Sequence, residues 1–152
     1  VCAEVPKKQK HIFVYSLVVG ESVMSVASKL SEAKGLPIVV KEAGGKVKKE
    51  DTIEDWFAEF RDAEYVVTDS FHGMVFSIIF NKPFSIVMNP SGGNDRYISL
   101  LSQLGLMDRI IKDNQISSLE SINWDGVNQK LAVLRQESMN FLKVNFNQTH
   151  EE

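Results

Sequence analysis

Cysteine is almost missing from this sequence, since Cys2 is the only one among 152 residues. No intrachain disulfide is therefore expected, and the cysteine content favours a cytoplasmic location over an oxidising compartment. The sequence also lacks an apolar run of the roughly 18 to 20 residues that cross a bilayer, and its N-terminus lacks a basic segment followed by an apolar one. We accordingly expect no transmembrane segment.

Basic residues are not in excess, and several ligand signatures are missing. The formal net charge of −3 argues against a nucleic-acid partner, which would normally require clustered lysine and arginine. No glycine motif of the dinucleotide-binding or phosphate-loop kind is present. His11 and His150 have no cysteine or carboxylate at metal-ligand spacing. We therefore assign no metal site and no cofactor.

Short apolar segments rich in β-formers alternate with segments of helical apolar spacing. This alternation predicts an α/β fold, a Rossmann-like parallel sheet with helices on both faces. We expect one domain over residues 1–152, with a polar lead-in at 1–10 and a frayed tail at 146–152. The start at Val1 is what a piece of a longer protein would show. The expected strands are 11–17, 38–40, 65–67, 84–88 and 110–111. Three expected helices contain the apolar segments 23–30, 74–80 and 98–104, and two more are expected near 53–63 and 125–145.

Helix boundaries are indicated by capping residues and stop signals. Thr52 and Asp55 have capping-box spacing, and Gly35 and Gly105 end two of the helices. Asp125 is the expected N-cap of the last helix, whose apolar stripe combines Val127, Leu131, Leu134, Phe141 and Leu142.

The segment from Thr68 to Gly73 has the most unusual polar content. It joins a strand to a helix, and ligands of parallel sheets bind at the carboxyl ends of strands, near helix N-termini. Asp69 or Ser70 is expected to cap the helix, and Gly73 would let a ligand approach the backbone. His72 lies in the first helical turn, where an imidazole needs an anionic or polar partner. Such a site suits a phosphate or a carboxylate.

A second candidate site is the loop before the following helix. Gly92 and Gly93 allow the main chain to curl around an oxyanion, and Asn94 is a possible cap. Arg96 offers a forked donor for a carboxylate or phosphate. The same composition is also that of an ordinary turn.

The stretch AEYVVTDSFHGMVFSIIFNKP, residues 63–83, resembles the most recognisable segment of the polysaccharide pyruvyl transferase family. The stretch NDRYISLL at 94–101 resembles the arginine-led helix of that family. The resemblance implies the C-terminal half of a two-domain, B-type glycosyltransferase-like fold, with the donor site in the cleft between the domains. It also implies transfer of a pyruvyl group from phosphoenolpyruvate to sugar hydroxyls of a cell-surface polysaccharide, as a ketal.

Carried over to this sequence, the family motif identifies His72 as the candidate catalytic residue, either as proton donor or as phosphate contact. Asp69, Ser70, Phe71, Gly73 and Asn94 are the further candidates for donor binding, with Arg96 pairing the anionic groups of the donor. The implied partners are phosphoenolpyruvate, a glycan or lipid-linked saccharide acceptor, which would bring the protein to the inner face of the membrane, and an N-terminal domain that this chain does not include. Without that domain the chain is expected to be inactive. Two alternatives stay open, a nucleotide-sugar glycosyltransferase domain and a non-catalytic glycan-assembly module.

Overall fold

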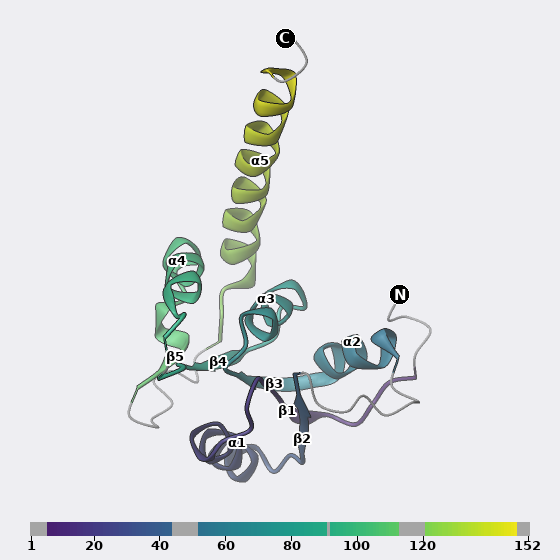
Figure 1. The fold of residues 1–152 in the computed structure, drawn as a ribbon. Coiled ribbons are helices and arrows are strands. Elements are labelled where there is room, and N and C mark those ends of the chain that lie inside the picture. The colour runs from purple at the N-terminus through teal and green to yellow at the C-terminus, as the bar shows by residue number, and fades with distance from the viewer. Residues whose placement is uncertain (1–5, 44–51, 91, 113–120, 149–152) are drawn as a thin grey trace.

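A five-stranded parallel sheet forms the centre of the molecule (Figure 1). The computed structural model describes residues 6–43, 52–90, 92–112 and 121–148. The strands lie in the order β2-β1-β3-β4-β5, and all four neighbouring pairs are parallel. They span His11–Ser16 (β1), Ile38–Glu42 (β2), Ala63–Thr68 (β3), Phe84–Val87 (β4) and Ile110–Ile111 (β5). The parallel sheet expected from the short apolar segments is confirmed.

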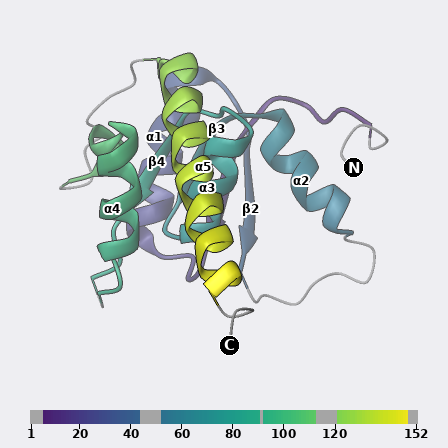
Figure 2. The same cartoon turned by 90° about the horizontal axis from the view of Figure 1, so that it is seen from above.

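Helices cover both faces of this sheet. In Figure 1, α1 lies below the sheet, whereas α2, α3, α4 and α5 lie above it. Seen from above in Figure 2, α2 and α4 lie on either side of α3. The helices span Glu21–Lys34 (α1), Ile53–Asp62 (α2), Phe71–Ile79 (α3), Asp95–Leu104 (α4) and Trp124–Gln148 (α5), and the short 3-10 helix η2 spans Met107–Arg109.

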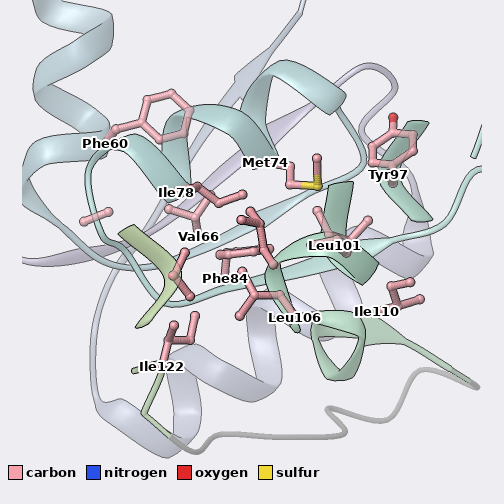
Figure 3. Close-up of a cluster of buried hydrophobic side chains, with 14 of the residues drawn as sticks. Phe60, Val66, Met74, Ile78, Phe84, Tyr97, Leu101, Leu106, Ile110 and Ile122 are labelled. Atoms are coloured by element: carbon pink, nitrogen blue, oxygen red, sulfur yellow. The ribbon is translucent and has the colours of Figure 1, made fainter. Parts of the chain in front are cut away.

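Each face of the sheet has its own apolar core. On the α1 face, Val26 and Leu30 pack with Ile12 and Val14 of β1. The larger cluster on the other face joins side chains of β1, β3 and β4 to α2, α3, α4 and the first turn of α5 (Figure 3). Its buried members include Phe13, Phe60, Val66, Met74, Ile78, Phe84, Leu101 and Val127.

Most of the expected helix boundaries are confirmed by local contacts. The Thr52 side chain accepts a hydrogen bond from the Asp55 backbone N–H, and the Asp55 side chain accepts one from the Thr52 N–H, which completes the capping box. Gly35 and Gly105 end their helices in the left-handed region, with φ of 64° and 73°. A residue without Cβ adopts that conformation without strain.

The last helix differs from the prediction at both ends. Asn123, instead of Asp125, is its N-cap, because the Asn123 side-chain oxygen accepts the Gly126 N–H at 3.1 Å. The helix continues to Gln148, so residues 146–148 are helical, and the remainder of the expected tail lies outside the described residues. Val127 packs on the core, but Phe141 is 70% exposed because the helix has already passed the edge of the domain (Figure 1).

The assignment of the cap can be tested by a pair of alanine variants. Asn123→Ala removes the acceptor of the Gly126 N–H and should lower the free energy of unfolding by about 1 kcal/mol. Asp125→Ala loses only a favourable charge in the first turn and should cost about 0.5 kcal/mol or less. Urea denaturation compares the two, and a larger cost for Asp125→Ala would contradict the assignment.

Candidate functional site

The candidate site lies at the carboxyl edge of the sheet, where the strand order reverses between β1 and β3. In doubly wound folds this switch point is where ligands bind, because the loops after the two strands diverge there. β1 ends at Ser16 and β3 ends at Thr68. The Thr68–Gly73 segment predicted from the sequence therefore follows one of the two strands that border the switch point.

Asp69 links three segments of this edge. Its Oδ1 accepts the Leu17 backbone N–H at 2.7 Å, and its backbone carbonyl accepts the Tyr97 hydroxyl at 2.7 Å. Its Oδ2 is 2.9 Å from the Ser16 hydroxyl, which shares its single proton between this oxygen and the Val18 carbonyl at 2.8 Å. Both carboxylate oxygens thus have partners within the fold, and the predicted contact of Asp69 with a donor stays a prediction.

Ser70 is the N-cap of α3, which decides between the two cap candidates. Its hydroxyl oxygen accepts the Gly73 backbone N–H at 3.5 Å, and its own N–H donates to Thr68 Oγ1 at 3.0 Å. Ser70 and Thr68 are both buried. The Thr68 and Ser70 hydroxyl groups therefore fix the junction between β3 and α3. They also hold the first turn of α3 in one orientation.

Gly73 is required by packing within the domain. A Cβ at this position would lie 2.2 Å from Thr68 Oγ1 and 3.0 Å from Tyr15 Cδ1. The group that closely approaches the Gly73 backbone is therefore the Thr68 side chain of β3, where a ligand had been expected. Any contribution of Gly73 to donor binding stays a prediction.

Phe71 brings the two candidate segments together. The Arg96 guanidinium carbon lies 5.2 Å from the centroid of the Phe71 ring, which is within the range of a cation–π contact. The His72 ring lies 6.4 Å from the Phe71 ring, and Tyr97 packs edge-on against Phe71 at 5.7 Å. His72 and Arg96 are both exposed. We call Phe71, His72 and Arg96 the edge cluster.

The edge cluster lies where two helices begin. His72 is in the first turn of α3, and Arg96 is in the first turn of α4. The positive ends of both helix dipoles therefore lie at the carboxyl edge of the sheet. Backbone N–H groups at such ends, with a guanidinium and an imidazole beside them, provide donors for oxyanions. Groups of this kind suit a small anion such as a phosphate or a carboxylate, and anion binding here stays a prediction.

Asn94 does not cap α4 through its side chain, and its predicted contact with the donor stays a prediction. It occupies the N-cap position of α4 but makes no side-chain capping bond. Its amide instead bridges the loop, accepting the Asn89 N–H at 3.2 Å and donating to the Asn89 carbonyl at 2.9 Å. Gly92 and Gly93 have φ of 98° and 80°, which allows this tight loop, and Ser91 lies outside the described residues. Asn94 therefore shapes the loop that precedes Arg96.

Sequence reasoning missed the contribution of Tyr97 and of the loop after β1. In the sequence, Tyr97 looks like one more member of the apolar stripe of α4. The available signal is that the hydroxyl of a buried tyrosine usually has a hydrogen-bond partner. Leu17 and Val18 are 43% and 70% exposed beside Asp69. Nothing in their local sequence distinguishes them from the end of a buried strand.

The described part of the chain supports neither a metal site nor a membrane-spanning helix. The described residues contain no group of three or more histidine, cysteine, aspartate or glutamate side chains arranged to hold a metal ion. None of their helices has both the length and the apolar character needed to cross a membrane. His150, the other histidine weighed as a ligand beside His11, lies outside the described residues.

Comparisons with solved structures and with curated proteins give no information on the function of the site. A comparison with solved structures finds similarity to a chain in the "Crystal structure of the RPS4 and RRS1 TIR domain heterodimer", at 19% identity over 84% of this chain and 97% of that one, with a TM-score of 0.43. This similarity is too low to inform on function. A comparison with curated proteins finds no match.

A family model described as polysaccharide pyruvyl transferase matches residues 3–91. The match runs from before β1 to the loop after β4, and so it includes Asp69–Gly73 and stops before Arg96. Because the matched segment is more than half of the sequence, the chain belongs to the polysaccharide pyruvyl transferase family.

Proposed function

We propose that this chain is the donor-side, C-terminal domain of a polysaccharide pyruvyl transferase. In the complete protein, an N-terminal domain would form the opposite wall of the cleft. The donor would be phosphoenolpyruvate, and the acceptor would be a sugar of a cell-surface polysaccharide, presented as a glycan or a lipid-linked saccharide. Family membership supports transferase activity, and the carboxyl-edge position of the edge cluster supports an anionic donor.

The contact of Arg96 with Phe71 beside His72 is the observation that carries the proposal. It joins the matched family segment to a basic side chain 25 positions away, at the N-termini of two helices. Phosphoenolpyruvate carries its phosphate and its carboxylate on the same carbon atom. Two anionic groups of this size suit one forked guanidinium and one imidazole, supplemented by helix N–H groups.

Ketal formation defines what these residues must do. A proton is added to the donor's methylene carbon, which becomes a methyl group, and the adjacent carbon acquires oxocarbenium character. Two sugar hydroxyl oxygens bond to that carbon, and the carbon–oxygen bond to phosphate breaks. One hydroxyl proton restores the acid, and the other leaves with the phosphate. Arg96 would pair the anionic groups, and His72 would deliver the proton or contact the phosphate.

An NMR titration with phosphoenolpyruvate tests the proposal. We expect the largest shifts at residues 69–73 and 94–97. His72→Ala and Arg96→Ala should each weaken binding about tenfold or more, because each removes a hydrogen bond to a charged group. Arg135→Ala is the matched control, since it removes an exposed arginine on the distant α5.

Unchanged signals at His72 and Arg96, or an equal loss of affinity in Arg135→Ala, would show that the edge cluster does not hold the donor. Uridine and guanosine diphosphate form a second arm of the titration. Binding of these nucleotides without binding of phosphoenolpyruvate would favour the nucleotide-sugar alternative.

A further inference from the structure

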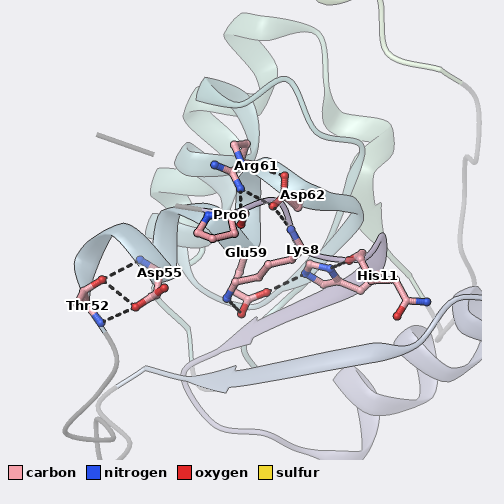
Figure 4. A network of polar contacts seen from close by, with 9 residues as sticks. Pro6, Lys8, His11, Thr52, Asp55, Glu59, Arg61 and Asp62 are labelled. Carbon is pink, nitrogen blue, oxygen red and sulfur yellow. Dashed lines mark hydrogen bonds and ion pairs between the residues drawn. The ribbon is translucent and has the colours of Figure 1, made fainter. Parts of the chain in front are cut away.

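A partly buried charge network lies at the opposite, amino-terminal edge of the sheet (Figure 4). His11, the first residue of β1, is 2% exposed. Its Nδ1 is 2.7 Å from the Gln9 carbonyl oxygen, and its Nε2 is 3.1 Å from Glu59 Oε2. A carbonyl and a carboxylate only accept hydrogen bonds. Because each ring nitrogen faces an acceptor, this environment favours the doubly protonated imidazolium.

Glu59 is shared between His11 and the lead-in segment. It is 5% exposed, and its Oε1 contacts the Lys8 ammonium while its Oε2 faces the imidazole. The Nε2–Oε2 pair is not aligned as a hydrogen bond, so its attraction comes mainly from charge. A neutral imidazole would lose most of that attraction, and its lone pair would then face either the Glu59 carboxylate or the Gln9 carbonyl, both of which only accept.

The last turn of α2 also contacts the main chain of the lead-in. Asp62 Oδ2 accepts the Lys8 backbone N–H at 2.8 Å, and the Arg61 guanidinium donates to the Pro6 carbonyl at 3.1 Å. Arg61 and Asp62 are themselves paired at 2.6 Å. Residues 6–8 are thus held to α2 by main-chain contacts, and the Lys8–Glu59–His11 chain ties the same segment to the start of β1.

We propose that protonation of His11 holds residues 6–10 against the end of α2, and that this segment loosens when the ring loses its proton. The further charges around the network are Lys10, paired with Glu64 of β3 at 3.0 Å, and Lys82, which lies near Asp62 and Glu64. The two ring nitrogens of His11 face the Gln9 carbonyl and the Glu59 carboxylate. The Glu59 carboxylate is therefore the group through which the ring acts.

The direction of the pH effect follows from both partners. Burial acts to lower the pKa of His11, but contacts with Glu59 and the Gln9 carbonyl outweigh it, and the pKa is raised overall. Burial acts to raise the pKa of Glu59, but His11 and Lys8 outweigh it, and that pKa is lowered. The His11 contribution is complete below the usual histidine value of about 6.5 and is lost as the pH rises through the raised pKa. The Glu59 contribution is complete above about 4.5 and is lost in stronger acid.

Amide hydrogen exchange with a parallel NMR titration of the His11 ring tests the proposal. From about pH 5.5 to about pH 8.5, we expect the protection factor of the Lys8 amide to fall about fivefold or more, in step with deprotonation of His11. His11→Gln should remove the pH dependence, and Glu59→Gln should lower the pH at which the ring titrates. If His11→Gln does not fold, the wild-type and Glu59→Gln measurements are sufficient. A Lys8 protection factor independent of pH, or a ring that titrates below about 6.5, would overturn the proposal.

Discussion

Replacing Gly73 with alanine is expected to lower the free energy of unfolding by about 3 kcal/mol, which is the upper range for forcing a methyl group into a packed site. The added Cβ would meet Thr68 Oγ1 at 2.2 Å, well inside van der Waals contact. Thr68 cannot move away cheaply, because its hydroxyl donates to the Tyr15 carbonyl and accepts the Ser70 N–H. Chemical denaturation measures the loss.

Gly126→Ala is the matched control for this variant. Gly126 lies in the first turn of α5, and a Cβ added there would meet Asn123 Nδ2 first, at 3.3 Å, on an exposed side chain. The helix-forming preference of alanine should keep the change within about 1 kcal/mol. If Gly73→Ala is as mild as this control, the packing explanation is wrong. A stable Gly73→Ala that loses only phosphoenolpyruvate binding would restore the ligand-approach interpretation.

A double-mutant cycle with Thr68→Ala isolates the clash. Thr68→Ala alone removes two hydrogen-bonding partners from the turn and should be destabilising. In its presence the alanine at position 73 no longer meets Oγ1, so the cost of the second change should shrink. The two costs should therefore be clearly non-additive, as expected for residues in contact. Additive costs would mean that Gly73 is required for another reason.

The sequence predicts the elements of this fold well because their signals are local. Short apolar runs of two to seven residues identify the strands, and the Thr52–Asp55 pair and Gly35 identify helix ends. The two errors in α5 have local causes as well. Asn123 and Asp125 are both competent caps two positions apart, and helical periodicity tells which face of α5 is apolar without telling whether anything packs on it.

The candidate site is predicted only in part, because its contacts are distant in sequence. The polar content of Asp69–Gly73 after a strand is enough to indicate that segment. Its partners lie 52 positions away at Leu17 and 28 positions away at Tyr97, and no periodicity or spacing reports such contacts. The packing role of Gly73 could not be predicted either, since the sequence does not report that the Thr68 hydroxyl, five positions away, and the Tyr15 ring of another strand both lie against it.

Removing the Asp69 carboxylate is also expected to have a large effect on the free energy of unfolding. Asp69→Ala leaves the Leu17 N–H without its acceptor and removes the Ser16 partner, so we expect a loss of about 2 to 3 kcal/mol in the free energy of unfolding. Asp69→Asn keeps one acceptor but turns an amide N–H₂ toward a donor, and should cost less. Tyr97→Phe removes only the bond to the Asp69 carbonyl and should cost about 1 kcal/mol.

Donor binding by Asp69→Asn separates a positioning role from direct contact. If the carboxylate faced an anionic donor, removing its charge would relieve repulsion and strengthen phosphoenolpyruvate binding. If Asp69 instead orients the first turn of α3 by holding it to the loop after β1, the same change should weaken binding and broaden the His72 signals. We expect weaker binding, because both carboxylate oxygens already face donors from β1 and its loop. Tighter binding would assign Asp69 to the lining of the donor site.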